Sequence, residues 1–221
     1  MHGEALFYIG SFGITSIMVT MAGITLILSI VCIAGTRNLQ VVPTGFQALL
    51  EKGVENLEGI ICENLGKENG RRYLPILATI FIFIIISNYS GLLPMAGKLP
   101  GLAAPTSSLS VTASLAVIIF FTTHFAGIKA HGVGYVNHFI KPVFFLAPLL
   151  VLEEFVRPLS LSVRLYGNIF GEESVTEQFF HLIPLGVPLI MNALSLLMGF
   201  VQALVFLLLS ATYISGSIEG H

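Results

Sequence analysis

A permanently charged arginine lies inside an apolar stretch of this chain with no acidic residue close to it in the sequence. Arg164 has no Asp or Glu at the third or fourth position on either side. Its neighbours on the same helical face are small or polar, namely Ser160, Gly167, Asn168 and Gly171. A row of small residues lets another helix approach closely, and an arginine keeps its charge. We expect a carboxylate from another span or another protein to compensate Arg164. A buried arginine that backbone carbonyls satisfy is the alternative.

Three further charged residues precede Arg164 in the same stretch. Glu153 and Arg157 are four residues apart, and Glu154 and Arg157 are three apart. Residues at these spacings are neighbours on a helix, so one pair can neutralise itself. A charge at the centre of a membrane costs about 2.5–3.5 kcal/mol even on the mildest scale. We predict a structural ion pair among these three residues, and a functional role is equally consistent with the pattern.

The last apolar stretch carries polar residues at helical spacing. They are Asn192, Ser195, Gly199 and Gln202, with Ser210 and Tyr213 in continuation. One polar residue in a membrane helix often makes only a packing hydrogen bond. Four on one face favour a surface that lines water or faces Arg164. Between the two stretches lie Glu172, Glu173, Glu177 and His181, which form either the mouth of a cation path or a short loop of solvated charges.

The elements that position these residues are predicted to be membrane spans. Only 10% of the 221 residues are charged and 55% are apolar, whereas soluble domains have about 25% charged residues. About 20 apolar residues suffice to cross a bilayer. Five stretches fit, at about 9–35, 73–94, 107–126, 143–171 and 184–216. The first is too long for the apolar core of a signal peptide, so we expect it to be a true span.

The last two stretches are longer than a bilayer requires. A helix of about 30 residues is roughly 45 Å long, against a hydrocarbon core of about 30 Å. Such helices must tilt, break or protrude, and Pro148 and Pro158 can bend the fourth span. The predicted fold class is all-α. It is one polytopic membrane helical bundle over residues 1–221, with about five membrane spans, a cytoplasmic-surface amphipathic helix and two long tilted C-terminal helices.

The amphipathic helix is predicted between the first two spans, over about 43–66. Apolar residues recur there every three or four positions, and the opposite face carries Glu51, Lys52, Glu55 and Glu58. This pattern is typical of a helix with one apolar face. Because no soluble domain surrounds the segment, we expect it to lie on the membrane surface.

The orientation follows from the basic residues, since cytoplasmic loops are enriched in Lys and Arg. With the N-terminus outside, seven basic residues fall on the cytoplasmic side and only Lys98 falls outside. The seven are Arg37, Lys52, Lys67, Arg71, Arg72, Lys129 and Lys141. The reverse orientation would invert this ratio. We therefore predict an outer N-terminus and a cytoplasmic C-terminus.

Other classes of function find little support in the sequence. The net charge of −2 gives no sign of a nucleic-acid partner. Cys32 and Cys62 have no metal-ligand spacing, and we predict neither a metal site nor a cofactor. An intramembrane protease would need a nucleophile and base at depth, and no Gly-x-Ser-x-Gly or HExxH motif is present. An ion-coupled secondary transporter fits intramembrane charge but usually has repeated halves, which are not evident here. It is kept as the alternative.

Three motifs resemble those of subunit a of F-type ATP synthases. They are EEFVRPLSLSVRLYGN at 153–168, PILAT at 75–79 leading to SNYSGLLP at 87–94, and VQALVF at 201–206. The resemblance covers nearly the whole chain in order, and RLxGN at 164–168 is its most specific part. It implies a multi-pass subunit of the bacterial plasma (inner) membrane, non-catalytic by itself, which couples the flow of H⁺ or Na⁺ through two half-channels to rotation.

The resemblance also implies partners and residue roles. The partners are a ring of c subunits, the peripheral stalk of b subunits, the remaining subunits of the complex and the lipid membrane. Arg164 matches the essential arginine that faces the ring, Gln202 the glutamine opposite it, and Glu173 the acid of the outer ion path. Some members have a histidine at the position of Ser195, and His181 is the candidate substitute. Further candidates on the path are Asn168, Asn192 and Asn88. The choice between H⁺ and Na⁺, the working direction and the ring size stay open.

Overall fold

The structure of the chain is a computed structural model, which describes residues 5–9, 12–37, 40–41, 43, 45–92, 103–132, 147–182 and 187–219. Almost all of these residues are helical. The helices are α1 (Ser16–Thr36), α2 (Phe46–Leu65), α3 (Lys67–Ser90), the 3₁₀ turn η1 (Pro105–Ser107), α4 (Leu109–His131), α6 (Ala147–Leu182) and α7 (Val187–Glu219). The strands β1 (Ala5–Ile9) and β2 (Phe12–Thr15) form a short antiparallel hairpin before α1.

Four of the described helices are long and apolar enough to cross a membrane. They are α1, α3, α4 and residues 190–219 of α7. The polytopic helical bundle predicted from the sequence is therefore confirmed. Helix α6 is the longest described element with 36 residues, but it carries the charged residues that the sequence placed in the fourth span.

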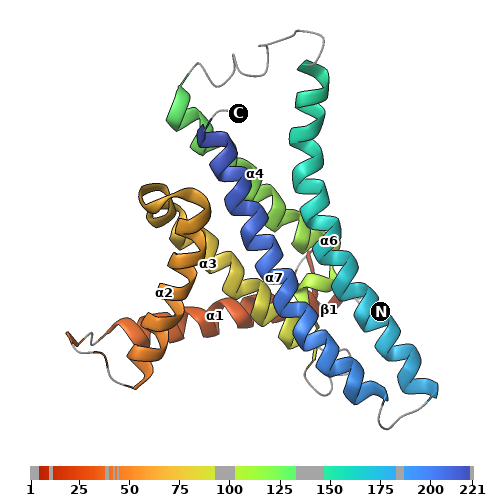
Figure 1. Cartoon of the computed structure of the whole chain (residues 1–221). Coiled ribbons are helices and arrows are strands. Elements are labelled where there is room, and N and C mark those ends of the chain that lie inside the picture. The colour runs from red at the N-terminus through yellow and green to blue at the C-terminus, as the bar shows by residue number, and fades with distance from the viewer. Residues whose placement is uncertain are drawn as a thin grey trace.

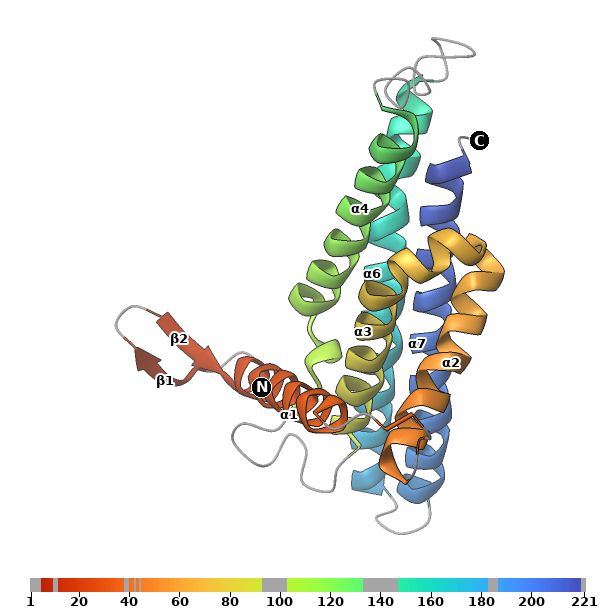
Figure 2. The same ribbon diagram turned by 90° about the vertical axis from the view of Figure 1, so that its left-hand side faces the viewer.

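The two C-terminal helices run antiparallel and side by side (Figures 1 and 2). At 1.5 Å per residue, the 36 residues of α6 and the 33 residues of α7 extend over about 54 Å and about 50 Å. In Figure 1, α6 begins at the upper end of the molecule and α7 returns from the lower end. Helix α1 lies crosswise to both of them near the lower end (Figures 1 and 2).

A continuous apolar core joins α3, α4, α6 and α7. Its fully buried members include Leu77, Ile84, Ile119, Leu165, Phe206 and Ile214. Helix α2 adds Leu57, Ile61 and Leu65 to this core, so one edge of its apolar face packs against the bundle. The predicted amphipathic segment is thus a helix that packs against the bundle, with its charged face outward.

Two glycines help to position α2 against α3, one through a turn and one through a close contact. Gly66 has a φ of 76°, which favours glycine, and it forms the turn between α2 and α3. At Gly70 an added Cβ would lie 2.8 Å from the Cα of Cys62, so α2 and α3 can approach only because this side chain is absent. Cys62 therefore has a packing role, and both Cys32 and Cys62 are free thiols.

Helix bounds differ from the predicted spans at both ends. The fourth predicted span ends at 171, whereas α6 continues to Leu182. The first predicted span begins at residue 9, whereas α1 begins at Ser16 because residues 5–9 and 12–15 pair as strands. The second begins at 73, whereas α3 begins directly after the turn at Gly66. The first turn of α3 can be polar because the residues before Tyr73 need not lie in the apolar part of a membrane.

Candidate functional site

Arg164 lies near the middle of α6 with its side chain exposed. Among the residues that the structure describes, no carboxylate lies within ion-pair distance of its guanidinium group. The opposite face of α6 is buried through Leu161, Leu165 and Ile169. It is fixed to α4 by a 3.2 Å hydrogen bond between the hydroxyls of Ser162 and Thr112. The packing of α6 therefore turns Arg164 away from the core.

The small residues around Arg164 leave this face of α6 open. A Cβ atom added at Gly167 or at Gly171 would meet nothing within 4 Å. Large apolar side chains flank the row and are also exposed. They are Leu159, Val163 and Phe170 on α6, and Leu194, Leu197 and Val201 on α7. The result is an apolar surface over α6 and α7 with one cation in it, which we call the Arg164 face.

One turn beyond Arg164, α6 is joined to α7 by a side-chain hydrogen bond. The amide of Asn168 donates to Oε1 of Gln202 over 2.8 Å. Gln202 is only 4% exposed, so its amide lies between the helices rather than on the Arg164 face. Arg164 and Gln202 are thus neighbours through Asn168, and no direct hydrogen bond joins them among the described residues.

One turn further along, a second polar contact joins the same two helices. The hydroxyl of Ser195 lies near the carboxylate of Glu172. Ser195 is 6% exposed and Glu172 is half-buried. The sequence did not single out Glu172 among its acidic neighbours. The signal was available, because Arg164, Asn168 and Glu172 follow one another at intervals of four residues.

Asn88 ties the lower end of α3 to two other elements. Its amide donates to the backbone carbonyl of Gly199 over 2.9 Å, and its Oδ1 accepts from Thr106 over 2.8 Å. A Cβ at Gly199 would lie 3.2 Å from the Cβ of Asn88, so the glycine permits this contact. Both polar atoms of Asn88 are engaged, which makes it a clamp between α3, η1 and α7.

Glu173 lies beside this clamp. Its Oε1 would be 3.2 Å from a Cβ at Gly91, at the C-terminal end of α3. The two adjacent acids of α6 therefore point to different neighbours, Glu172 to α7 and Glu173 to α3. Of the other predicted path residues, Asn192 is exposed on α7. His181 belongs to α6, but its side chain lies outside the described residues.

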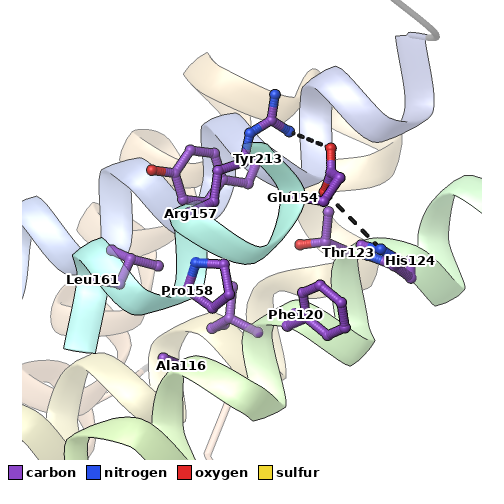
Figure 3. A pocket seen from close by; sticks show the side chains of 10 residues that line it. Ala116, Phe120, Thr123, His124, Glu154, Arg157, Pro158, Leu161 and Tyr213 are labelled. Atoms are coloured by element: carbon purple, nitrogen blue, oxygen red, sulfur yellow. Dashed lines mark hydrogen bonds and ion pairs between the residues drawn. The ribbon is translucent and has the colours of Figure 1, made fainter. Parts of the chain in front are cut away.

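The three other charges of α6 form a separate cluster towards the upper end of the bundle. Arg157 donates to Glu153 over 2.8 Å and to Glu154 over 2.9 Å, and its guanidinium carbon lies 5.5 Å from the centre of the Tyr213 ring. His124 of α4 lies 4.0 Å from Glu154. Figure 3 shows Glu154, Arg157, His124 and Tyr213 among the side chains that line a partly open pocket. Sequence reasoning identified the ion pair but did not place His124 or Tyr213 beside it, because these residues come from distant segments.

The fold and this arrangement define a class of protein. It is a polytopic helical membrane protein in which Arg164 lies on an open face, without an ion pair among the described residues. A hydrogen bond joins the two longest helices one turn away from this arginine. The family model for the ATP synthase A chain matches residues 16–215. The chain belongs to the ATP synthase subunit a family, as its motifs predicted.

Several curated relatives support this assignment over most of their length. A protein of Moorella thermoacetica named ATP synthase subunit a is 43% identical over 221 aligned residues, which cover 98% of this chain and 96% of the relative. One of Geobacter sulfurreducens with the same name is 44% identical over 196 residues, covering 87% and 82%. One of Trichlorobacter lovleyi is 41% identical over 220 residues, covering 98% and 92%.

Proposed function

We propose that this chain is the ion-conducting stator subunit of a bacterial F-type ATP synthase and that Arg164 faces the moving ring of c subunits. The observation that carries this proposal is the exposed guanidinium group on the Arg164 face, which forms no ion pair with any residue that the structure describes. A charge at membrane depth needs a partner. Since the described part of the chain supplies none, the partner is a carboxylate of another subunit.

The apolar surround of Arg164 fits such a partner. Leu159, Val163 and Leu197 are 61%, 50% and 57% exposed, respectively. The glycines between them leave room for a passing helix. A ring of helices that each carry one carboxylate would present apolar surface and charge in turn to this face.

The mechanism follows from the charge of Arg164. A carboxylate within a few Å of a guanidinium group is favoured in its ionised form. A ring carboxylate that reaches Arg164 therefore releases its ion and cannot carry it past. Ions that enter on one flank must ride the ring to the other flank, so ion flow becomes rotation. The chain itself forms and breaks no covalent bond, and nucleotide chemistry belongs to other subunits.

Two half-channels are needed, one on each flank of Arg164. The contacts Asn168–Gln202 and Glu172–Ser195, with Glu173 nearby, supply polar groups between Arg164 and the lower end. Towards the upper end, the pocket beside Arg157 and Glu154 supplies polar space for the second path. In that pocket the buried hydroxyl of Thr123 has no hydrogen-bond partner among the described residues, which suits water.

The crosswise position of α1 suggests how the chain sits in the bilayer. If α1 crosses upright, α6 and α7 lie steeply tilted, which accommodates their length. Helix α2 then runs along a membrane surface (Figure 1). The excess of Lys and Arg places this surface on the cytoplasmic side and the N-terminus outside. The two half-channels, which run along the same pair of helices, can then open to opposite sides of the membrane.

Disulfide cross-linking in the whole complex tests the position of the ring. With Cys32 and Cys62 replaced, Gly167→Cys on the Arg164 face should cross-link to a cysteine placed next to the ring carboxylate of subunit c. Phe125→Cys on α4, where Phe125 is 65% exposed, is the matched control and should give no such product. Cross-links from Phe125 alone would refute the assignment. Purification distinguishes this proposal from an ion-coupled secondary transporter, because a transporter would be active without a c ring or a peripheral stalk.

A further inference from the structure

The direction in which Arg164 points depends on the rotation of α6 about its own axis. Ser162 lies two residues before Arg164. Successive residues of an α-helix are about 100° apart, so these two side chains lie about 200° apart around α6. Ser162 is 2% exposed and faces α4, which packs along α6 (Figure 2). A contact that holds Ser162 against α4 therefore determines where Arg164 points.

The partner of Ser162 is Thr112, a fully buried residue in the first turn of α4. Their hydroxyl oxygens are 3.2 Å apart. The Thr112 hydroxyl also donates to the backbone carbonyl of Leu109 over 3.2 Å. Because a hydroxyl group has only one proton to donate, Thr112 is then the acceptor for the proton of Ser162. Both buried hydroxyl groups are satisfied in this arrangement.

The first turn of α4 is itself anchored to other helices. It follows η1, where Thr106 donates to Asn88 of α3 over 2.8 Å. Asn88 in turn donates to the backbone carbonyl of Gly199 on α7 over 2.9 Å. The place at which Ser162 is held is therefore fixed relative to α3 and α7 as well as to α4.

A small rotation of α6 would displace the Arg164 guanidinium group. A helix with its side chains has a radius of about 5–6 Å, so a rotation of about 10° moves a side-chain tip by about 1 Å. A misplacement of about 1 Å can slow a catalysed step by about 100-fold. The buried residues Leu161 and Leu165 pack through apolar contacts, which have no preferred direction. A hydrogen bond requires a defined distance and angle, so the Ser162 contact restricts the rotation further.

We propose that Ser162 and Thr112 are positioning residues for ion translocation. Their hydrogen bond fixes the rotation of α6 and so holds the Arg164 guanidinium group where the ring carboxylates pass. Both residues are buried between α4 and α6, so they act through Arg164 and not on the ion itself. This inference rests on the proposed function, because it requires that Arg164 meets the ring.

Two double variants of the whole complex separate positioning from stability. Ser162→Ala with Thr112→Val removes both hydroxyl groups and leaves neither without a partner, so the midpoint temperature for dissociation should stay near the wild-type value. ATP-driven ion uptake in proteoliposomes should still fall by about tenfold, as expected for a misplaced group. Ser162→Thr with Thr112→Ser keeps both hydroxyl groups and should keep most of the uptake. Ser114→Ala with Thr122→Val is the matched control on α4, because these hydroxyl groups donate to carbonyls of their own helix, and it should keep the wild-type rate.

Cross-linking to the ring reports the rotation of α6 directly. Around this helix, Gly171 lies about 20° from Arg164 and Phe170 about 120° from it. In a background without Cys32 and Cys62, Gly171→Cys should cross-link to a cysteine beside the ring carboxylate in much higher yield than Phe170→Cys. The ratio of these two yields should fall in the variant without the two hydroxyl groups and stay unchanged in the variant that exchanges them.

Three outcomes would overturn the inference. Wild-type uptake after removal of both hydroxyl groups would show that the hydrogen bond does not position Arg164. Equal losses of uptake in the two double variants would mean that packing volume matters and the hydrogen bond does not. Loss of the ring from the purified Ser162→Ala and Thr112→Val variant would reduce the pair to a structural role. The proposed function fails separately, since it predicts that Arg164→Ala is inactive whatever the two hydroxyl groups do.

Discussion

Asn168 and Gln202 are joined across the interface of α6 and α7 by a hydrogen bond of 2.8 Å, one helical turn from Arg164. The contact fixes the register of the two longest helices at the point where the Arg164 face begins. Gln202 holds Asn168, the residue one turn from Arg164, and Gln202 itself is only 4% exposed.

Replacing Gln202 with Leu should weaken this interface. The amide of Asn168 would lose its acceptor, at a cost of about 1–3 kcal/mol. We expect a lower midpoint temperature for dissociation of the complex in detergent and slower ion uptake. Gln202→Glu keeps an acceptor at the same place and should retain more of the stability. Equal midpoints for Gln202→Leu and the wild type would contradict this role.

Asn88 is predicted to matter for stability because both of its polar atoms are engaged. Asn88→Ala removes the bonds to Gly199 and Thr106, at a cost of about 2 kcal/mol. The thermal midpoint of the purified complex and the amount assembled should both fall. Asn192→Ala, at an exposed position on α7, is the control and should leave the midpoint unchanged. Similar effects of the two variants would disprove the clamp.

Arg157→Ala should act mainly on folding and assembly. The substitution leaves Glu154, whose side chain is 17% exposed, without its cation. We expect about 2 kcal/mol of destabilisation. This is less than for a fully buried pair, because the Arg157 side chain is 32% exposed. Adding Glu154→Gln should recover part of the assembled complex. Arg71→Ala breaks the exposed pair with Glu58 and is the control with little effect. No recovery in the double variant would argue against simple charge compensation.

Cysteine labelling tests the orientation that the basic residues predict. The background lacks Cys32 and Cys62, and single cysteines replace Gly97, Ser174, Gly132 and Ser217. An impermeant reagent should label the first two from outside and the last two only from the cytoplasmic side. The physical reason is the excess of Lys and Arg on one side of the spans. Reversed labelling at any two sites would require the opposite orientation.

The sequence predicts the features that depend on local helical spacing. The unpaired Arg164, its row of small neighbours and the pairing of Arg157 with Glu153 or Glu154 all lie within one helix, so intervals of three and four residues suffice. Length and hydropathy likewise predict the long C-terminal helices.

Contacts between distant segments could not be predicted in the same way. Asn88 and Gly199 are 111 residues apart, and no periodic pattern specifies that they meet. The choice of Glu172 rather than Glu173 as the partner of Ser195 depends on the rotation of α6 against α7. That rotation is set by packing around Leu165 and Ile169. Strand β2 falls within the predicted first span, because short apolar runs do not distinguish strands from helices.

The most direct test of the central claim is ion-driven ATP synthesis by the whole complex in proteoliposomes carrying Arg164→Ala. Loss of the Arg164 guanidinium group should abolish both synthesis and ATP-driven pumping, while the c ring still copurifies. Passive ion leak should not fall, because removing the charge also removes the barrier between the two half-channels. Arg164→Lys should rescue poorly, since a desolvated ammonium group can lose its proton and a guanidinium group does not. ATP synthesis at near wild-type rates in Arg164→Ala would contradict the account.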